Sequence, residues 1–598
     1  MYFKEFDETQ HELLSQVSRP SRYSASEWRY YEKPDWENSG LKICLTFPDV
    51  YEIGMSYYGF QVINGFIKSL NKKLNKNYLT DRAYAVWSDM AQKLRENNSK
   101  IYSVEQKKSL NEFDVIAFTL PHEAAYTNIL NIINLAGLEI RTQNRNKNDP
   151  LIIAGGYGAY VPEPMSAFID LFCVGDAEAV LPDLLDVLDN SRGLDLIERL
   201  NLCKDIPGVY IPSIHAINNK NHDKNKIVYR QIAKKFFMPQ SMIVPSVSVV
   251  HDRAAIELFK GCGRGCRFCQ AGMVNRPVRE ANVNDAKESI LNILKSTGWD
   301  EVGLLSLSSC DYSGIENLID NLSSELENRK ARLSLPSLRM DGFSVGLAER
   351  LSGINSRRGS ITFAPEAGTQ RLRDVINKGL TDEIITNCLH EIFTRGWDRV
   401  KLYFMMGLPT ENYDDLKAIS ELAKNTLKLG RSMGRKKVTV SVSVSGFVPK
   451  AHTPFQWERQ NSIEELREKG RFIKSENHER SITINYHEPE QTFLEGVLSR
   501  GDKKTCDVIE QAWKMGAEFD NWTEKFDLNR WLEAFEIVSL NPNDYTRERN
   551  ENELLPWDFI NVGITKEFLL RERHKAYEGK LTVDCRNGCG VCGLDCKK

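Results

Sequence analysis

Three closely spaced cysteines, Cys262, Cys266 and Cys269, are the residues of this chain with the most evident chemistry. They follow a C-x3-C-x2-C pattern, and Phe268 stands immediately before the last of them. Three thiolates in this arrangement bind three irons of a [4Fe–4S] cluster and leave the fourth iron without a protein ligand. A structural zinc site normally has four protein ligands, and no fourth lies near this segment. We therefore expect an iron–sulfur cluster with one iron open to a small molecule.

The residues between these cysteines suit a loop that wraps a cluster. Gly261, Gly263 and Gly265 allow backbone angles and close approaches that other residues resist. Arg264 and Arg267 are expected to offset the negative charge of a thiolate-ligated cluster.

A second group of cysteines lies in the segment 584–596: Cys585, Cys589, Cys592 and Cys596. Four thiolates so close together indicate metal binding, either tetrahedral zinc or a second iron–sulfur cluster. The chain has 13 cysteines, and their concentration in these two groups fits ligation in a reducing cytosol better than disulfides. The sequence leaves zinc and iron–sulfur open.

Composition places the chain among ordinary globular proteins. Its 598 residues suggest about four domains. The net charge of −3 gives no global basic field that would indicate nucleic acid, although a local RNA-binding surface stays open. The N-terminal residues lack the order of a signal peptide, and no apolar run reaches the ~20 residues of a membrane helix. We expect a cytoplasmic protein without membrane contact.

The elements that would position these cysteines follow an α/β pattern. Residues 41–47, 114–120 and 151–154 read as buried strands, and residues 126–138 have helical periodicity. Strands that alternate with helices predict a doubly wound parallel sheet, with ligands near the carboxyl ends of the strands. The segment 215–232 reads as an exposed hairpin or linker.

A second α/β pattern begins near residue 250. Six strand–helix repeats predict a partial (β/α)6 barrel, and the cysteine loop follows the first strand, as active-site loops do in such barrels. The expected strands are 254–259, 301–307, 331–335, 360–363, 400–404 and 438–444. We expect four regions: an α/β domain with an N-terminal extension, 1–245; a barrel, 246–460; a mainly helical region, 461–575; and a Cys-rich tail, 576–598.

The segment 260–273, KGCGRGCRFCQAGM, resembles the signature loop of the radical SAM superfamily. The resemblance implies that S-adenosylmethionine chelates the open iron and that an electron then cleaves its C–S bond to give a 5′-deoxyadenosyl radical. It also implies a reducing partner such as flavodoxin or ferredoxin. The cofactors carry such chemistry, and the protein supplies orientation and shielding.

The same resemblance suggests which residues contact S-adenosylmethionine. They lie in the cysteine loop and in segments that follow the predicted strands: Phe268, Ser308, Ser309, Arg339, Glu366, Lys378 and Gly407. The Gly-Gly-Glu version of the segment after the second strand is absent here, which weakens the assignment of the two serines. No catalytic acid or base is assigned.

The N-terminal α/β domain resembles the cobalamin-binding domains of cobalamin-dependent radical SAM enzymes. The resembling stretches point to five residues as cobalamin contacts: Tyr51, Gly54, His122, Gly155 and Gly156. The Asp-x-His-x-x-Gly motif, whose histidine ligates cobalt, does not occur in the chain. Cobalamin binding therefore stays open.

Nearly the whole chain resembles a fused family with a cobalamin-binding-like domain before a radical SAM core. Its segments 19–23, 51–56, 265–272, 493–502 and 556–558 carry the resemblance without naming a substrate. We expect a radical SAM enzyme, in one version a methyltransferase that uses methylcobalamin to methylate an unactivated carbon. An RNA-modifying enzyme of methylthiotransferase type is the alternative, followed by a non-catalytic iron–sulfur redox protein.

Overall fold

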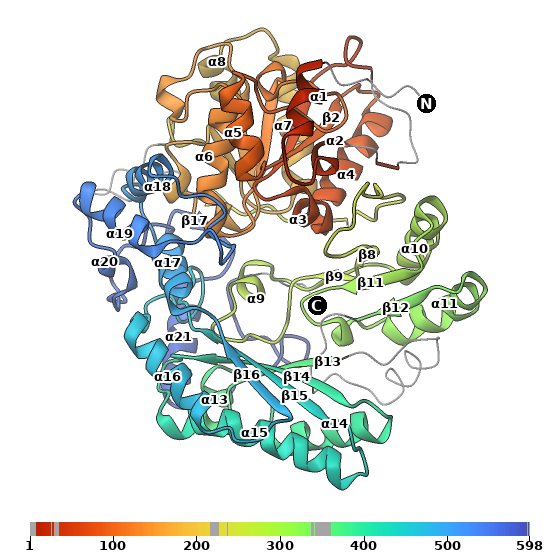
Figure 1. The fold of residues 1–598 in the computed structure, drawn as a ribbon, viewed down its shortest axis with the longest axis vertical. Helices are drawn as coiled ribbons and strands as arrows, with labels where there is room; N and C mark the ends of the chain where they lie inside the picture. The colour runs from red at the N-terminus through yellow and green to blue at the C-terminus, as the bar shows by residue number, and fades with distance from the viewer. Residues whose placement is uncertain are drawn as a thin grey trace.

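The computed structural model describes residues 8–24, 27–28, 35–215, 227–235, 237–335, 340, 360–594 and 596. An N-terminal α/β unit lies above two further parallel sheets, and C-terminal helices run along one side of all three (Figure 1). The expected α/β architecture is confirmed. Most of the segment 215–232 lies outside the described residues.

The N-terminal unit is a six-stranded sheet in the order β2-β1-β3-β4-β5-β6. Its first five strands are parallel and β6 is antiparallel to β5. One hydrophobic cluster packs α5 and α6 on one face, and another packs α4, α7 and α8 on the other, which makes the sheet doubly wound. The strands are β1 (Lys42–Phe47), β2 (Leu79–Tyr84), β3 (Val115–Thr119), β4 (Leu151–Gly155), β5 (Leu171–Cys173) and β6 (Val209–Tyr210). The helices are α3 (Tyr51–Ser56), α4 (Tyr58–Leu74), α5 (Ser88–Glu96), α6 (Tyr126–Leu135), α7 (Ala177–Asn190) and α8 (Leu196–Cys203).

Strand β2 was not predicted, because its charged residues interrupt the apolar pattern that is typical of a buried strand. Asp81 and Arg82 are almost fully buried in this strand. The Asp81 carboxylate accepts the backbone N–H groups of Glu105 and Gln106, at 2.9 and 2.7 Å. Arg82 forms an ion pair with the carboxylate of Glu105. Paired charges of this kind occupy core positions that a hydrophobicity pattern assigns to the surface.

The central region contains two parallel sheets, of order β12-β11-β8 and β13-β14-β15-β16. All six expected strands are present: β8 (Ala254–Glu257), β11 (Glu301–Leu305), β12 (Arg332–Ser334), β13 (Ile361–Glu366), β14 (Arg399–Met406) and β15 (Thr439–Gly446). Helices α10 (Val283–Thr297), α11 (Ile315–Arg329), α14 (Asp382–Thr394) and α15 (Tyr413–Ser432) lie between them. A seventh parallel strand, β16 (Ile482–Tyr486), pairs with β15 in a region expected to be mainly helical. Only alternate residues of β16 are buried, so the strand has two apolar core residues and no continuous apolar run that would predict it.

The C-terminal helices join the units. Val508 of α18 (Thr505–Lys514) and Trp531 of α19 (Leu528–Ile537) belong to the same hydrophobic cluster as Ile129 of α6. The Thr127 hydroxyl, also on α6, donates to the Asp520 carboxylate at 2.9 Å. The remaining C-terminal elements are α16 (Ile463–Ser475), α17 (Pro489–Ser499), α20 (Asn543–Thr546), β17 (Ile560–Asn561) and α21 (Lys566–Tyr577).

The C-terminal end of the chain lies at the centre of the molecule in Figure 1, near β9 (Phe259–Lys260) and α9 (Gln270–Val274). Cys585 donates its backbone N–H to the Gly263 carbonyl at 3.0 Å, so the tail lies directly on the cysteine loop. Among the described helices, none has the length and apolar character needed to cross a membrane.

Candidate active site

The cysteine loop connects β9 to α9. Gly261 has a φ of 87°, and a Cβ there would lie 2.6 Å from the carbonyl oxygens of Asn275 and Pro277. Only glycine therefore fits this start of the loop. At the other end, the Cys269 sulfur accepts the Gly272 backbone N–H at 3.2 Å. The tight turn at Gly261 and the hydrogen bond to the Cys269 sulfur fix the two ends of the segment that carries the thiols.

The three thiols lie in a mutually interacting group. Burial, with the neighbouring Cys266 thiolate, raises the pKa of the Cys269 thiol to about 12, whereas the Lys378 ammonium acts in the opposite direction. In the part of the chain that the structure describes, no three His, Cys, Asp or Glu side chains converge where a single metal ion would bind. Cluster ligands do not need to converge in this way, because each thiolate of a cubane binds a different iron.

The two loop arginines have acidic partners beside the cysteines, and Arg267 also interacts with the Cys266 thiolate; whether they offset cluster charge stays a prediction. The Arg264 guanidinium lies 3.0 Å from Asp311 and 3.2 Å from Asp584. Arg267 is fully buried, 3.2 Å from the Glu572 carboxylate, and donates to the Lys580 carbonyl. Carboxylates and carbonyls thus compensate both positive charges. Since two of these acidic partners lie near the far end of the chain, local sequence gives no signal of them.

Glu366 and Lys378 meet beside the loop. Glu366 ends β13 with a φ of 71°, and its carboxylate accepts the Lys378 ammonium at 3.0 Å. The adjacent Asn377 side chain donates to the Gly265 carbonyl at 3.1 Å, which fixes this segment against the loop. Phe268 packs against the hydrophobic cluster that contains Leu372, Leu408 and Phe447. Three of the residues suggested for S-adenosylmethionine, Phe268, Glu366 and Lys378, are therefore gathered around the cysteines.

The other residues suggested for S-adenosylmethionine have different surroundings. The Ser309 hydroxyl donates to the Leu304 carbonyl at 3.0 Å and accepts from Ser306 at 2.9 Å, so it stabilises its own turn. Ser308 is buried beside it. Gly407 has a φ of 85° and donates its N–H to the Glu411 carboxylate at 2.8 Å. Arg339 lies outside the described residues.

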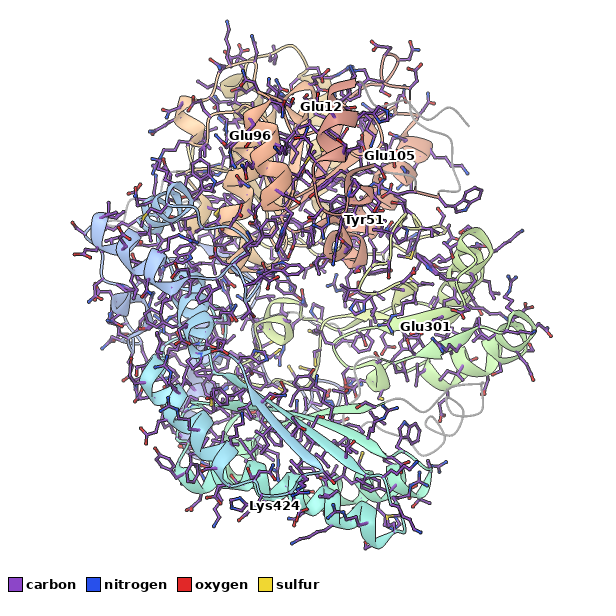
Figure 2. All side chains as sticks on the ribbon, viewed as in Figure 1. Glu12, Tyr51, Glu96, Glu105, Glu301 and Lys424 are labelled. Atoms are coloured by element: carbon purple, nitrogen blue, oxygen red, sulfur yellow. The ribbon has the colours of Figure 1, made fainter. Side chains whose placement is uncertain are left out.

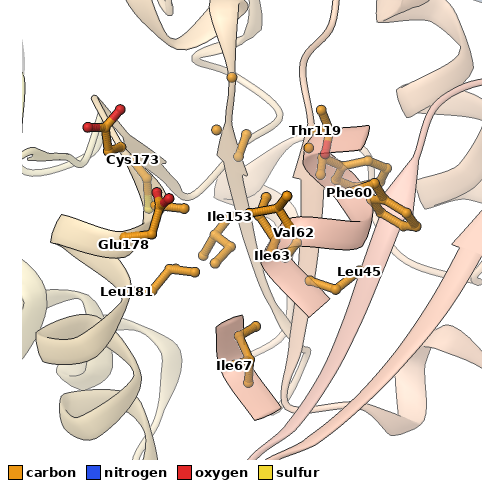
Figure 3. Close-up of a pocket in the computed structure, with 18 of the residues that line it drawn as sticks. Leu45, Phe60, Val62, Ile63, Ile67, Thr119, Ile153, Cys173, Glu178 and Leu181 are labelled. Carbon is orange, nitrogen blue, oxygen red and sulfur yellow. The ribbon is translucent and has the colours of Figure 1, made fainter. Parts of the chain in front are cut away.

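A cavity of about 240 Å³ opens at the carboxyl ends of the N-terminal strands. Its walls come from β1, β3, β4, α4 and α7, and Figure 3 shows mainly aliphatic side chains around it. The lining residues include Leu45, Ile63, Ile67, Ile153 and Leu181, with Thr119 as a polar member. The acidic Glu178 lies at its edge. This position is where open parallel sheets bind their ligands.

A second cavity, of about 330 Å³, continues from the first toward the cysteine loop. Both are lined by Tyr57, Gly156, Gly175, Asp176, Glu257 and Lys260. The second also includes Gly261, Asn275 and Ser306. The Lys260 ammonium pairs with the Glu178 carboxylate at 2.7 Å across the junction. The two cavities therefore adjoin along a shared wall, and the second reaches Gly261, the residue next to Cys262.

Glu257 lies on the wall shared by the two cavities. Burial, together with the nearby Glu178 and Asp176 carboxylates, raises the pKa of its carboxyl group to about 7, against the opposing charge of Lys260. No sequence signal identified this residue, because a glutamate in a strand of alternating burial ordinarily faces solvent. A carboxyl group that changes charge near neutral pH is suited to proton transfer.

The structure separates the five residues suggested for cobalamin. Gly155 and Gly156 line the first cavity. Tyr51 does not: it is buried in the N-terminal unit (Figure 2), where its hydroxyl donates to Glu27 at 2.8 Å. Gly54 packs on Tyr84, whose ring carbons would lie 2.4 Å from a Cβ. His122 lies near Asp49, Glu123, Lys450 and Glu495, and no histidine is among the described residues that line either cavity.

Two regions of the chain match known protein families, and one curated protein matches most of its length. Residues 63–212 match the family described as radical SAM proteins, N-terminal, and residues 256–423 match the radical SAM superfamily. An uncharacterised protein of Methanocaldococcus jannaschii, MJ0966, is 28% identical over 434 residues, which cover 72% of this chain and 87% of that protein.

Comparison with solved structures gave matches that span most of the chain, among them two enzymes. One is the radical S-adenosylmethionine methyltransferase TsrM from Kitasatospora setae with cobalamin and a [4Fe–4S] cluster bound; it is 12% identical, has a TM-score of 0.51, and the match covers 84% of this chain and 99% of that one. The other is the cobalamin-dependent S-adenosylmethionine radical enzyme OxsB, at 13% identity and a TM-score of 0.48, covering 95% and 84%. The protein described here therefore contains an N-terminal radical SAM domain and a radical SAM core domain.

Proposed function

We propose that this protein is a cobalamin-dependent radical SAM enzyme that transfers a methyl group to an unactivated carbon. The observation that carries the proposal is the pair of adjoining cavities between the N-terminal sheet and the cysteine loop. A ligand in the first cavity would lie on the side of the α/β domain that faces a cofactor at Cys262, Cys266 and Cys269. A reducing partner of the flavodoxin or ferredoxin class would supply the electron.

The residues around the loop fit a [4Fe–4S] cluster and S-adenosylmethionine. Cys262, Cys266 and Cys269 would hold three irons of such a cluster and leave the fourth open to S-adenosylmethionine, to whose sulfonium the cluster would supply an electron. Glu366 and Lys378 offer a carboxylate and an ammonium at the same place. These two groups complement the amino and carboxylate groups of a bound amino acid.

The residues around the first cavity fit the nucleotide tail of cobalamin. Its aliphatic walls suit a flat aromatic base, and Gly156, with a φ of 101°, lets the backbone approach closely. When bound, cobalamin supplies a transferable methyl group. Because no histidine is among the described lining residues, this site would hold the corrin without a histidine ligand from its walls. Glu257, on the shared wall, is the group that we assign to proton transfer.

Filling the apolar cavity tests the cobalamin part of the proposal. Ala117 lines this cavity, and we expect Ala117→Trp to lower the corrin retained after purification from cobalamin-supplied cells by more than tenfold. Leu202→Trp, at a residue that is 53% exposed on α8, is the control and should retain corrin. Thermal unfolding without cobalamin shows whether the filled variant is folded. Equal corrin in Ala117→Trp and wild type would contradict this site.

The radical SAM part is tested separately. Reductive cleavage of S-adenosylmethionine to 5′-deoxyadenosine should be lost in Cys266→Ala and retained in Ala117→Trp. Cleavage by Cys266→Ala at the wild-type rate would refute the role of the loop.

A further inference from the structure

We propose that the tail cysteines Cys585, Cys589, Cys592 and Cys596 bind a second iron–sulfur cluster, and that the C-terminal segment holds it against the loop of the first. The inference rests on the proposed function for the identity of the first cluster. The second site is argued from the tail itself and from its contacts.

The ligand set of the tail is complete. Four thiolates satisfy all four irons of a cubane, so a cluster there has no open iron and no place for S-adenosylmethionine. Cys592 is buried, and the Cys589 sulfur accepts the backbone N–H of Val591 at 3.4 Å, so the chain turns tightly between these two thiols. Tetrahedral zinc requires four sulfurs at about 2.3 Å from one point. Within the described segments no three such ligands converge on one point, and the thiolates of a cubane do not need to, because each binds a different iron.

The tail is docked on the first loop by backbone and charge. Cys585 donates its N–H to the Gly263 carbonyl at 3.0 Å, one residue from Cys262. Around this contact, two arginines and two aspartates form a closed ring. Arg264 binds Asp311 and Asp584, and Arg586 binds the same two carboxylates at 3.1 and 2.9 Å. The ring is electrically neutral, so docking leaves no unpaired charge at the contact.

A second set of contacts anchors the segment that leads into the tail. Thr582 donates its N–H to the Asn377 side chain at 2.9 Å, and Asn377 in turn binds the Gly265 carbonyl. The Lys580 carbonyl accepts from the buried Arg267 at 2.6 Å. Cys592 is buried in a hydrophobic cluster with Met273, which belongs to the helix that follows Cys269. The tail site is therefore fixed to both ends of the first loop.

Metal analysis and electron paramagnetic resonance (EPR) of anaerobically reconstituted full-length protein test the proposal. Two cubanes require about eight irons and eight sulfides per chain, with little zinc. Replacing Cys262, Cys266 and Cys269 by alanine should leave about four irons, which then report the tail alone. Cys589→Ser with Cys596→Ser, two exposed positions, should also leave about four. We expect the dithionite-reduced wild type to show an EPR signal broadened by interaction between the clusters, and either variant to show one unbroadened signal.

The outcomes are distinct. About four irons and one zinc in the wild type, with the zinc lost in the tail variant, would overturn a second cluster. A loop variant that folds but binds no iron would overturn it as well. Two clusters with no magnetic interaction would overturn the docking. If S-adenosylmethionine is not cleaved but both clusters are present, the proposed function fails and this inference stands.

Discussion

Replacing Glu257 by glutamine should make the stability of the protein less dependent on pH. The pKa of Glu257 is raised from 4.5 to about 7, chiefly by burial. The folded protein therefore holds this proton more tightly than the unfolded chain does. The contribution of Glu257 to the free energy of unfolding is fully present below about pH 4.5 and is lost between about pH 4.5 and 7. The difference between the two pKa values corresponds to about 3 kcal/mol at most, and to roughly 2 kcal/mol between pH 5.5 and 8. Contact with solvent in the cavity reduces this figure.

Thermal unfolding measures the effect. With no S-adenosylmethionine or cobalamin added, the Tm of Glu257→Gln relative to wild type should rise between pH 5.5 and pH 8. A change of about 2 kcal/mol in a unit of 150–250 residues corresponds to about 4–8 °C. Glu325→Gln removes the same charge from an exposed position on α11 and should differ from wild type equally at both pH values. The reasoning is refuted if Glu257→Gln also shows the same difference at both.

Two further substitutions test the surroundings of the loop. Lys378→Met removes the ammonium that binds Glu366 and should lower the rate of S-adenosylmethionine cleavage by roughly 10–100-fold, the worth of a hydrogen bond to a charged group, with iron content unchanged. Lys424→Met on α15 (Figure 2) is the control. Cleavage at the wild-type rate by Lys378→Met would exclude a role for this lysine. Gly263→Ala places a Cβ 2.6 Å from the Asp584 carboxylate, whereas Gly590→Ala meets nothing closer than 3.5 Å. We expect proteolysis of the tail to accelerate several-fold in Gly263→Ala only, and equal rates in the two variants would contradict the docking contact.

Local patterns were sufficient to predict the architecture. The six expected core strands are short and bounded by turns, and several of them, such as β15, alternate apolar with polar residues; β1, β3 and β4 are continuous apolar runs. Strands buried on both faces produce such runs whatever their partners are. The metal-binding assignment of Cys262, Cys266 and Cys269 depends on spacing within one loop, which a sequence displays directly, and it stays a prediction.

The remaining features depend on partners far away in the chain. Strand β2 is stabilised by the pairing of Arg82 with Glu105, which neither segment reveals alone. Asp584 and Glu572, the carboxylates that pair with Arg264 and Arg267, lie in the C-terminal segment. The sequence around the two arginines therefore suggests that they are exposed or face the cluster. Glu257 acquires its altered pKa only when the N-terminal unit covers β8. Desolvation and long-range ion pairing have no local signature.

The contact between Arg267 and the Lys580 carbonyl joins residues 313 positions apart. During synthesis at about 5–20 residues per second, roughly 15–60 s pass before the second partner is made. For that interval the nascent loop lacks Glu572, Asp584 and the rest of its cover. With the tail docked, Cys262, Cys266 and Cys269 keep partial exposure, so the tail narrows access to the loop without closing it. The order of residues along the chain thus sets an order of assembly, in which the loop is made first and covered by the tail last.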